Sequence, residues 1–122
     1  MIVEAARRRS DTFHIGARAR FRDRDRADKL AECKTDARIG RVFLDRCIED
    51  FIAGRLDDAT AAMAKYWLSE CECRIVDECV QLHGGYGYMT EYPIARMWAD
   101  SRVHRLYAGA NEILKELIAT SL

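Results

Sequence analysis

Residues 81–93 read QLHGGYGYMTEYP, and this stretch decides how the chain folds. Three glycines fall within the four residues Gly84–Gly87, directly after a long helical pattern. Glycine lets the backbone turn sharply and approach a ligand closely, and bare N–H groups in such a turn can hold a phosphate. Pro93 needs no N–H in a first helical turn, so a new helix is expected to begin there. The stretch therefore predicts a turn between two helices.

The residues before this turn predict one long helix, about Asp58–Leu82. Apolar and small side chains recur there at steps of three and four, which is the spacing of one helix face. Asp57 or Asp58 is expected to begin the helix, because a short carboxylate accepts hydrogen bonds from the free N–H groups of a first turn. The face comprises Ala59, Ala62, Tyr66, Ser69, Cys73, Val76 and Val80, with Met63 and Trp67 beside it.

An earlier segment, about Asp28–Ala53, has the same spacing, and Gly54 is a plausible stop for it. Two long helices joined by a few residues pack antiparallel. The upstream face comprises Leu30, Cys33, Ala37, Gly40, Leu44, Cys47 and Phe51, widened by Ile48 and Ile52.

Two shorter helices are predicted after the turn. One begins at Pro93 and the other near Ala110 or Asn111. No strand-like alternation of useful length occurs, so the predicted class is all-α: a helical bundle of antiparallel long helices plus two shorter C-terminal helices. Their apolar residues are Ile94, Met97, Trp98 and Val103 in the first, and Ile113, Leu114, Leu117 and Ile118 in the second.

Composition narrows the possible functions. The 122 residues form one domain, and 20 basic residues balance 20 acidic ones, so no nucleic-acid partner is expected. No apolar run is long enough to span a bilayer, and the first residues lack a signal peptide's apolar core, so no membrane insertion is expected. Five cysteines are an odd number in a chain without a leader, which favours reduced thiols and a cytoplasmic location.

Residues 1–27 are set apart from residues 28–122 as a divergent or non-family basic segment. Eight arginines fall between Arg7 and Arg26, and the helical periodicity is poor. Three interpretations stay open: a solvated arm, an anion-binding segment, or a frame-shifted stretch joined to a family remainder. The frame-shift interpretation rests on composition, because a GC-rich gene read in the wrong frame yields a sequence rich in Arg, Asp and Ala.

Five ordered blocks carry a family resemblance, which covers about Lys29–Leu117. The chain closely resembles the C-terminal helical domain of the acyl-CoA dehydrogenases, and the long-chain type most of all. The resemblance implies FAD as cofactor, acyl-CoA as substrate and a homo-oligomer, either a dimer or a tetramer. It also implies a truncated enzyme that lacks the N-terminal and β domains. The blocks are Lys29–Glu32, Ala64–Trp67, residues 81–93, Asp100–Ile113 and Lys115–Ala119.

The resemblance also implies roles for individual residues. Ala108 and Gly109 would contact the substrate, and the N–H of Ala108 would hold the thioester carbonyl oxygen. Many relatives have the catalytic glutamate at the position of Ala108, but a methyl group cannot accept a proton, so no catalytic residue is assigned. The long-chain type carries its glutamate on an upstream helix, which has no counterpart in this sequence. The implied cofactor contacts are Gln81, Gly84 and Gly85 at the diphosphate and adenosine, and Ala110, Asn111 and Glu112 near the flavin.

No metal site is predicted. Cys71 and Cys73 are two residues apart on a helix, so they point to different sides. Cys33 and Cys47 lie on the apolar face, where packing is their expected role. His83 and His104 are interpreted as structural histidines, and the aromatic residues Tyr86, Tyr88, Tyr92 and Trp98 as packing the turn onto the helices.

Two hypotheses for the function remain. The chain is either a piece of an FAD-dependent acyl-CoA dehydrogenase that is inactive alone, or a non-catalytic helical oligomerisation module derived from that domain. A helical metal or haem protein is disfavoured, because the sequence lacks paired Glu-x-x-His motifs.

Overall fold

The computed structural model describes residues 17–122, with side chains from residue 24 onward. Within this range the secondary structure is entirely helical, which confirms the predicted all-α class. None of the helices in residues 17–122 has the length and apolar character needed to cross a membrane. The elements are α2 (Ala17–Ile52), α3 (Asp58–His83), the 3₁₀ helix η1 (Gly84–Tyr88), α4 (Pro93–Val103) and α5 (Asn111–Thr120).

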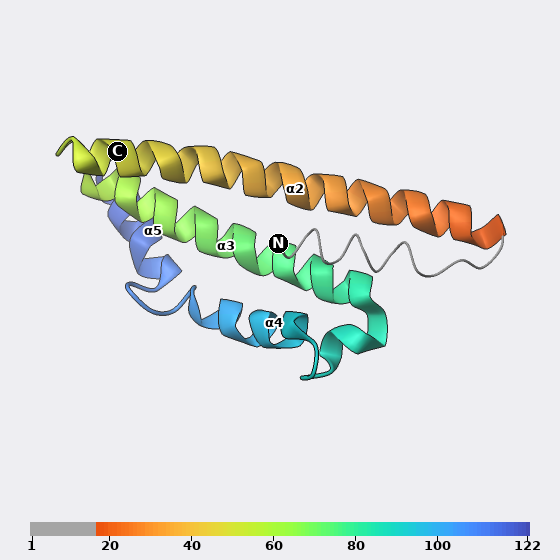
Figure 1. The fold of residues 1–122 in the computed structure, drawn as a ribbon. Helices are drawn as coiled ribbons and strands as arrows, with labels where there is room; N and C mark the ends of the chain where they lie inside the picture. The colour runs from red at the N-terminus through yellow and green to blue at the C-terminus, as the bar shows by residue number, and fades with distance from the viewer. Residues whose placement is uncertain (1–16) are drawn as a thin grey trace.

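The central helix of the bundle is α3, because α2, α4 and α5 all pack against it. Figure 1 shows α2 and α3 running side by side, with α4 on the other side of α3. A short turn joins α2 to α3, so the two helices are antiparallel, as the matched spacing predicted. Because three helices pack around α3, it has buried residues on several faces.

The first long helix begins earlier than the sequence indicated. It starts at Ala17 rather than Asp28, so the predicted N-terminal boundary was wrong. The first turns of α2 project past the end of α3 (Figure 1), and apolar periodicity is poor in that part of the sequence. Residues 1–16 lie outside the described residues. The separate status of residues 1–27 therefore stays a prediction.

The turn between α2 and α3 follows the predicted capping. Gly54 has a φ of 66°, in the left-handed region that favours glycine, and α2 ends just before it. Asp57 is the N-cap of α3: its carboxylate accepts from the Thr60 N–H at 2.8 Å and from the Thr60 hydroxyl at 2.7 Å. These two bonds hold the pKa of Asp57 below its ordinary value. Of the two aspartates proposed, Asp57 is the cap.

The glycine stretch is more ordered than a simple turn. After Gly84, whose φ is 59°, the chain forms η1 and then reaches Pro93 in the first turn of α4, as predicted. Gly87 is the buried glycine of η1. A Cβ added there would lie 2.5 Å from the carbonyl oxygen of Val80, so η1 packs directly on the last turns of α3.

The core is small and lies mainly around α3. Val76, Cys79 and Ile94 form its centre. On α2 the predicted face is only partly buried: Cys33, Gly40 and Cys47 are covered, but Phe51 is 73% exposed. Within the described residues α3 is the main neighbour of α2, and one helix cannot cover so wide a face.

Candidate functional site

The connection from α4 to α5 contains the most unusual backbone of the described residues. Ala108 has a φ of 51° and is the only non-glycine residue among them with a positive value. Gly109 follows with a φ of 92°. A left-handed conformation costs an alanine roughly 1–2 kcal/mol, so surrounding contacts must hold it in place.

Lys65 on α3 supplies such contacts. Its Nζ donates to the carbonyl oxygen of Gly109 at 2.6 Å and to Oδ1 of Asn111 at 2.8 Å. Leu114 packs against the turn, because a Cβ on Gly109 would lie 3.2 Å from Cδ2 of Leu114. The turn is therefore fixed on the side that faces α3.

Asn111 anchors α5 to α3. The residue is 1% exposed, and its Nδ2 donates to Oγ of Ser69 at 2.9 Å and to Oε1 of Glu70 at 3.0 Å. Ser69 has a single hydroxyl proton, which we assign to the Tyr66 carbonyl oxygen 3.0 Å away. The amide is thus committed to tertiary contacts and does not cap α5. The N-cap of α5 is Ala110, which makes no side-chain cap.

An ion pair supports this network. Arg105 donates to the carboxylate of Glu70, whose second oxygen accepts from Asn111. The hydrogen bond from Arg105 lowers the pKa of Glu70, and the same bond raises the pKa of Arg105. Nε of Arg105 is buried and has no hydrogen-bond partner within residues 17–122.

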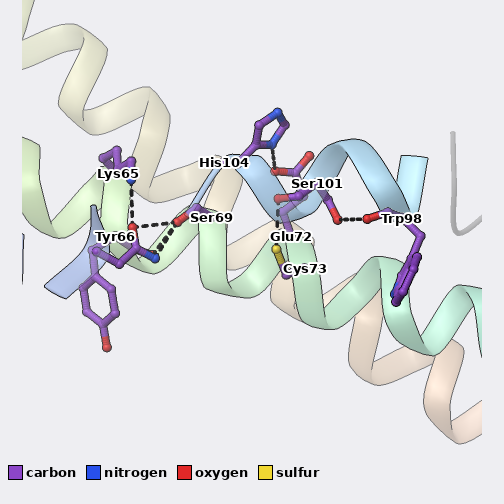
Figure 2. A network of polar contacts seen from close by, with 9 residues as sticks. Lys65, Tyr66, Ser69, Glu72, Cys73, Trp98, Ser101 and His104 are labelled. Atoms are coloured by element: carbon purple, nitrogen blue, oxygen red, sulfur yellow. Dashed lines mark hydrogen bonds and ion pairs between the residues drawn. The ribbon is translucent and has the colours of Figure 1, made fainter. Parts of the chain in front are cut away.

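A second polar group joins α3 to α4. Nδ1 of His104 lies 2.6 Å from the carboxylate of Glu72, and Sγ of Cys73 donates to the Ser101 carbonyl at 3.1 Å (Figure 2). His83 is also satisfied, since its Nδ1 lies 2.7 Å from the Cys79 carbonyl. A carbonyl only accepts, so Nδ1 of His83 carries the proton. Both histidines have the structural contacts that the sequence predicted.

The cysteines lie in different surroundings, as the sequence predicted. Cys33, Cys47 and Cys71 are buried, while Cys73 reaches toward α4 through its bond to Ser101. Burial raises the pKa of the Cys33, Cys47 and Cys71 thiols, and also that of Cys79, which is buried as well. In the part of the chain that the structure describes, no three His, Cys, Asp or Glu side chains gather as a metal site.

The aromatic residues near the glycine turn behave differently from one another. The rings of Tyr86 and Tyr92 lie 5.4 Å apart, and Nε1 of Trp98 donates to Asp77 at 2.9 Å. These contacts attach the turn and α4 to their neighbours. Tyr88 is 81% exposed, so the expectation that it packs onto the helices was wrong.

The predicted site residues fall into two groups that the fold keeps apart. Ala108, Gly109, Ala110, Asn111 and Glu112 come together beside Lys65. The other group, Gln81, Gly84 and Gly85, lies at the opposite end of α3. The helix between Lys65 and His83 measures about 27 Å at 1.5 Å per residue.

Both glycines of the second group leave the backbone open. A Cβ added at Gly84 or Gly85 would meet nothing within 4 Å, and Gln81 is exposed beside them. This openness suits the approach of a large anion from outside the chain. The assignment of the two groups to FAD and substrate stays a prediction.

Comparison with known proteins identifies the family. The sequence model described as "Acyl-CoA dehydrogenase, C-terminal domain" matches residues 2–122. The chain belongs to the acyl-CoA dehydrogenase family. It corresponds to the C-terminal helical domain, as the five sequence blocks predicted.

Individual relatives agree with this domain assignment. Over 94 residues the domain is 53% identical to the mitochondrial long-chain specific acyl-CoA dehydrogenase of Rattus norvegicus, covering 77% of this chain and 22% of that protein. It is 34% identical over 94 residues to an acyl-CoA dehydrogenase of Bacillus subtilis, covering 77% of this chain and 25% of that protein. The domain therefore spans about a quarter or less of the length of these relatives.

Solved structures have the same fold. Butyryl-CoA dehydrogenase from Megasphaera elsdenii superposes with a TM-score of 0.90 at 27% identity, over 98% of this chain and 31% of that chain. An acyl-CoA dehydrogenase from Geobacillus kaustophilus superposes with a TM-score of 0.76 at 35% identity, over 98% of this chain and 32% of that chain. Both comparisons support the helical arrangement around α3.

Sequence reasoning missed the residues that support the α4–α5 connection. Lys65, Glu70 and Arg105 received no role, and Ser69 was placed only on the packing face of the helix, although Lys65 lies in the block Ala64–Trp67 that carried the resemblance. The available signal was a lysine within the otherwise apolar run Ala61–Leu68. Its partners could not be read from the sequence, because they lie 44 and 46 positions away.

Proposed function

We propose that this domain forms one wall of the active site of an FAD-dependent acyl-CoA dehydrogenase of the long-chain type, which oxidises fatty acyl-CoA thioesters at the α and β carbons. The observation that carries the proposal is the clamped left-handed turn at Ala108 and Gly109. In residues 17–122 the backbone N–H of Ala108 donates to no backbone or side-chain acceptor, and Ala108 is exposed. That N–H is therefore open to a ligand oxygen.

In this role, the Ala108 N–H binds the thioester carbonyl oxygen and stabilises negative charge as the enolate develops. Gly84 and Gly85 present their backbone to the diphosphate of FAD, and Gln81 supplies an amide that both donates and accepts. FAD, when bound, supplies the hydride acceptor. Ala108 offers no proton acceptor, so in this proposal the catalytic base comes from outside this sequence, on the upstream helix that the long-chain type uses.

The isolated domain is expected to retain no FAD and to have no dehydrogenase activity. Two grooves are prominent among the described residues, one of about 350 Å³ between α2 and α3 and one of about 760 Å³ between α3 and α4. Neither is lined by Gly84 or Ala108. Neither groove therefore gives a flavin ring a pocket at these residues, and Ala108→Glu restores only one of the missing groups, so it should not restore activity.

A domain exchange tests the proposal. The 94 matched residues would replace the corresponding segment of the Rattus norvegicus long-chain enzyme, which then supplies the other domains and the base. The expected chimera is yellow and bleaches on addition of long-chain acyl-CoA. The unmodified rat enzyme is the positive control, and the same chimera with the host base removed is the negative control. A folded chimera that binds FAD but never bleaches would contradict the proposal.

The alternative is a non-catalytic oligomerisation module. The supporting observation is the apolar surface of α2, where Ile39, Val42 and Phe51 are more than half exposed. We expect the domain alone to form a dimer or tetramer through this surface. A chain that self-associates strongly while every chimera stays inactive would favour this function.

The five cysteines are free in this structure, which supports our proposal of a reducing, cytoplasmic location.

A further inference from the structure

We propose that Lys65 is a positioning residue of the acyl-CoA site: it holds the Ala108 N–H in its ligand-accepting direction. This inference rests on the proposed function of the α4–α5 connection. Lys65 itself would not touch the substrate. It acts through the carbonyl oxygen of Gly109 and the side chain of Asn111.

The geometry fixes the ammonium group from two directions. Nζ lies 2.6 Å from the Gly109 oxygen and 2.8 Å from Oδ1 of Asn111. Asn111 cannot rotate away, because its Nδ2 is bonded to Ser69 and Glu70 on the other side. The oxygen of this buried amide therefore faces Lys65, and Lys65 in turn holds the Gly109 carbonyl.

Holding the Gly109 carbonyl also restrains Ala108, because the two residues are neighbours in the backbone. Its left-handed φ of 51° is unfavourable for alanine, and its methyl group makes no bond that could hold it there. With the Gly109 carbonyl fixed, the peptide groups on both sides of Ala108 keep one orientation. Without Lys65, Ala108 can relax toward the common backbone regions, and its N–H then turns away from the present direction.

The choice of residue at position 65 also follows. A lysine reaches from α3 to the next segment with three N–H donors on one atom, enough for two acceptors. A methionine of similar length has no donor, so Lys65→Met leaves the Gly109 and Asn111 oxygens without their shared partner. Arginine retains donors, so Lys65→Arg should recover part of the effect.

The first experiment needs neither flavin nor substrate. The N–H of Asn111 donates to the Arg105 carbonyl across the connection at 3.1 Å, so its hydrogen exchange reports whether the connection is closed. In the full chain, Lys65→Met should raise the exchange rate of the Asn111 N–H about tenfold while the N–H groups of Val76 and Cys79 keep their protection. Lys34→Met, an exposed lysine on α2, is the matched control and should change neither.

The second experiment uses the chimera with the rat long-chain enzyme. Lys65→Met should lower kcat about tenfold with normal FAD content and less change in KM, because the Ala108 N–H acts mainly in the transition state. Lys65→Arg should recover part of kcat and part of the Asn111 protection.

The outcomes separate the two proposals. Unchanged Asn111 exchange in Lys65→Met would overturn the positioning role, and so would an equal loss of protection at Val76 and Cys79, which would mean a general structural role. A normal kcat in the Lys65→Met chimera would overturn it as well. The Asn111 exchange rate could rise as expected in Lys65→Met while the unmodified chimera is inactive. That result would count against the proposed function but would still support the positioning role of Lys65.

Discussion

At Gly87 the backbone of η1 lies against α3 with no room for a side chain, whereas at Gly85 the space is open. The sequence presents these glycines as equivalent members of one loop. Their surroundings make Gly87 a packing residue and leave Gly85 free for a ligand. Similarly, Asn111 looks like an ordinary first-turn residue of α5, but it is buried and bonded to three residues of α3.

Replacing Gly87 by alanine should destabilise the domain by roughly 1–3 kcal/mol, because the new methyl would meet the Val80 carbonyl and the His83 side chain. The matched substitution Gly85→Ala should change stability by less than about 0.5 kcal/mol. Urea unfolding followed by circular dichroism measures both. Equal effects at the two positions would show that the close packing of η1 on α3 does not govern stability.

Cys79 should make the domain sensitive to alkaline pH. Burial raises the pKa of its thiol to about 11, above the value of about 9 in an unfolded chain. The folded state therefore favours the neutral thiol, and this stabilisation is complete below pH 9 and lost as the pH rises toward 11. At pH 10 the loss should amount to about 1 kcal/mol.

The measurement compares urea unfolding of the wild type and Cys79→Ala at pH 7 and pH 10 under reducing conditions. The stability advantage of the wild type should shrink at pH 10. An advantage that is constant or larger at the higher pH would contradict the raised pKa.

At the scale of elements, α3 determines the arrangement because every other helix packs on it. Its beginning is fixed by Asp57, and its end is fixed by Gly84, whose N–H donates to the Gln81 carbonyl. Both ends position residues of the proposed site. The start of α3 sets where Lys65 meets the α4–α5 connection, and its end sets where Gly84 and Gly85 face outward.

Asp57→Ala should lower Tm by a few degrees, because the Thr60 N–H and hydroxyl lose their acceptor. Asp58→Ala, one residue later, is the control and should have little effect. The pKa of Asp57 is lowered in the folded state, so its stabilisation is present above about pH 4 and lost as the pH falls through the folded-state pKa. Thermal unfolding at pH 7 and pH 3 checks this: the difference between Asp57→Ala and wild type should be smaller at pH 3 than at pH 7.

At the scale of the whole molecule, the domain exposes more apolar side chain than it buries along α2. The groove between α2 and α3 is lined by Ile39, Phe43, Met63, Tyr66 and Trp67, all with apolar or aromatic surface. Within the described residues α3 is the main helical neighbour of α2. Such a surface favours association with further protein.

Light scattering of the purified chain should therefore report at least twice the monomer mass. Ile48→Glu, at a residue 43% exposed on α2, should shift the equilibrium toward monomer without loss of helix by circular dichroism. Leu106→Glu, at a residue 55% exposed between α4 and α5, places the same charge elsewhere and should leave the mass unchanged. A wild-type chain that is monomeric at high concentration would contradict the prediction.

The sequence by itself determined the features that depend on neighbours along the chain. Residues three and four apart share a helix face. The Asp57 cap, the Gly54 stop and the Pro93 start each act within one helical turn, so the local sequence was enough to predict them. The start of α2 at Ala17 was not predicted, because the sequence before Asp28 has no clear apolar periodicity. Only the tertiary structure decided the rest. It placed Lys65 against Gly109 and Asn111, packed Gly87 on Val80, and separated the two groups of site residues by the length of α3. These contacts join residues far apart in sequence, and their partners depend on how α4, α5 and η1 dock on α3.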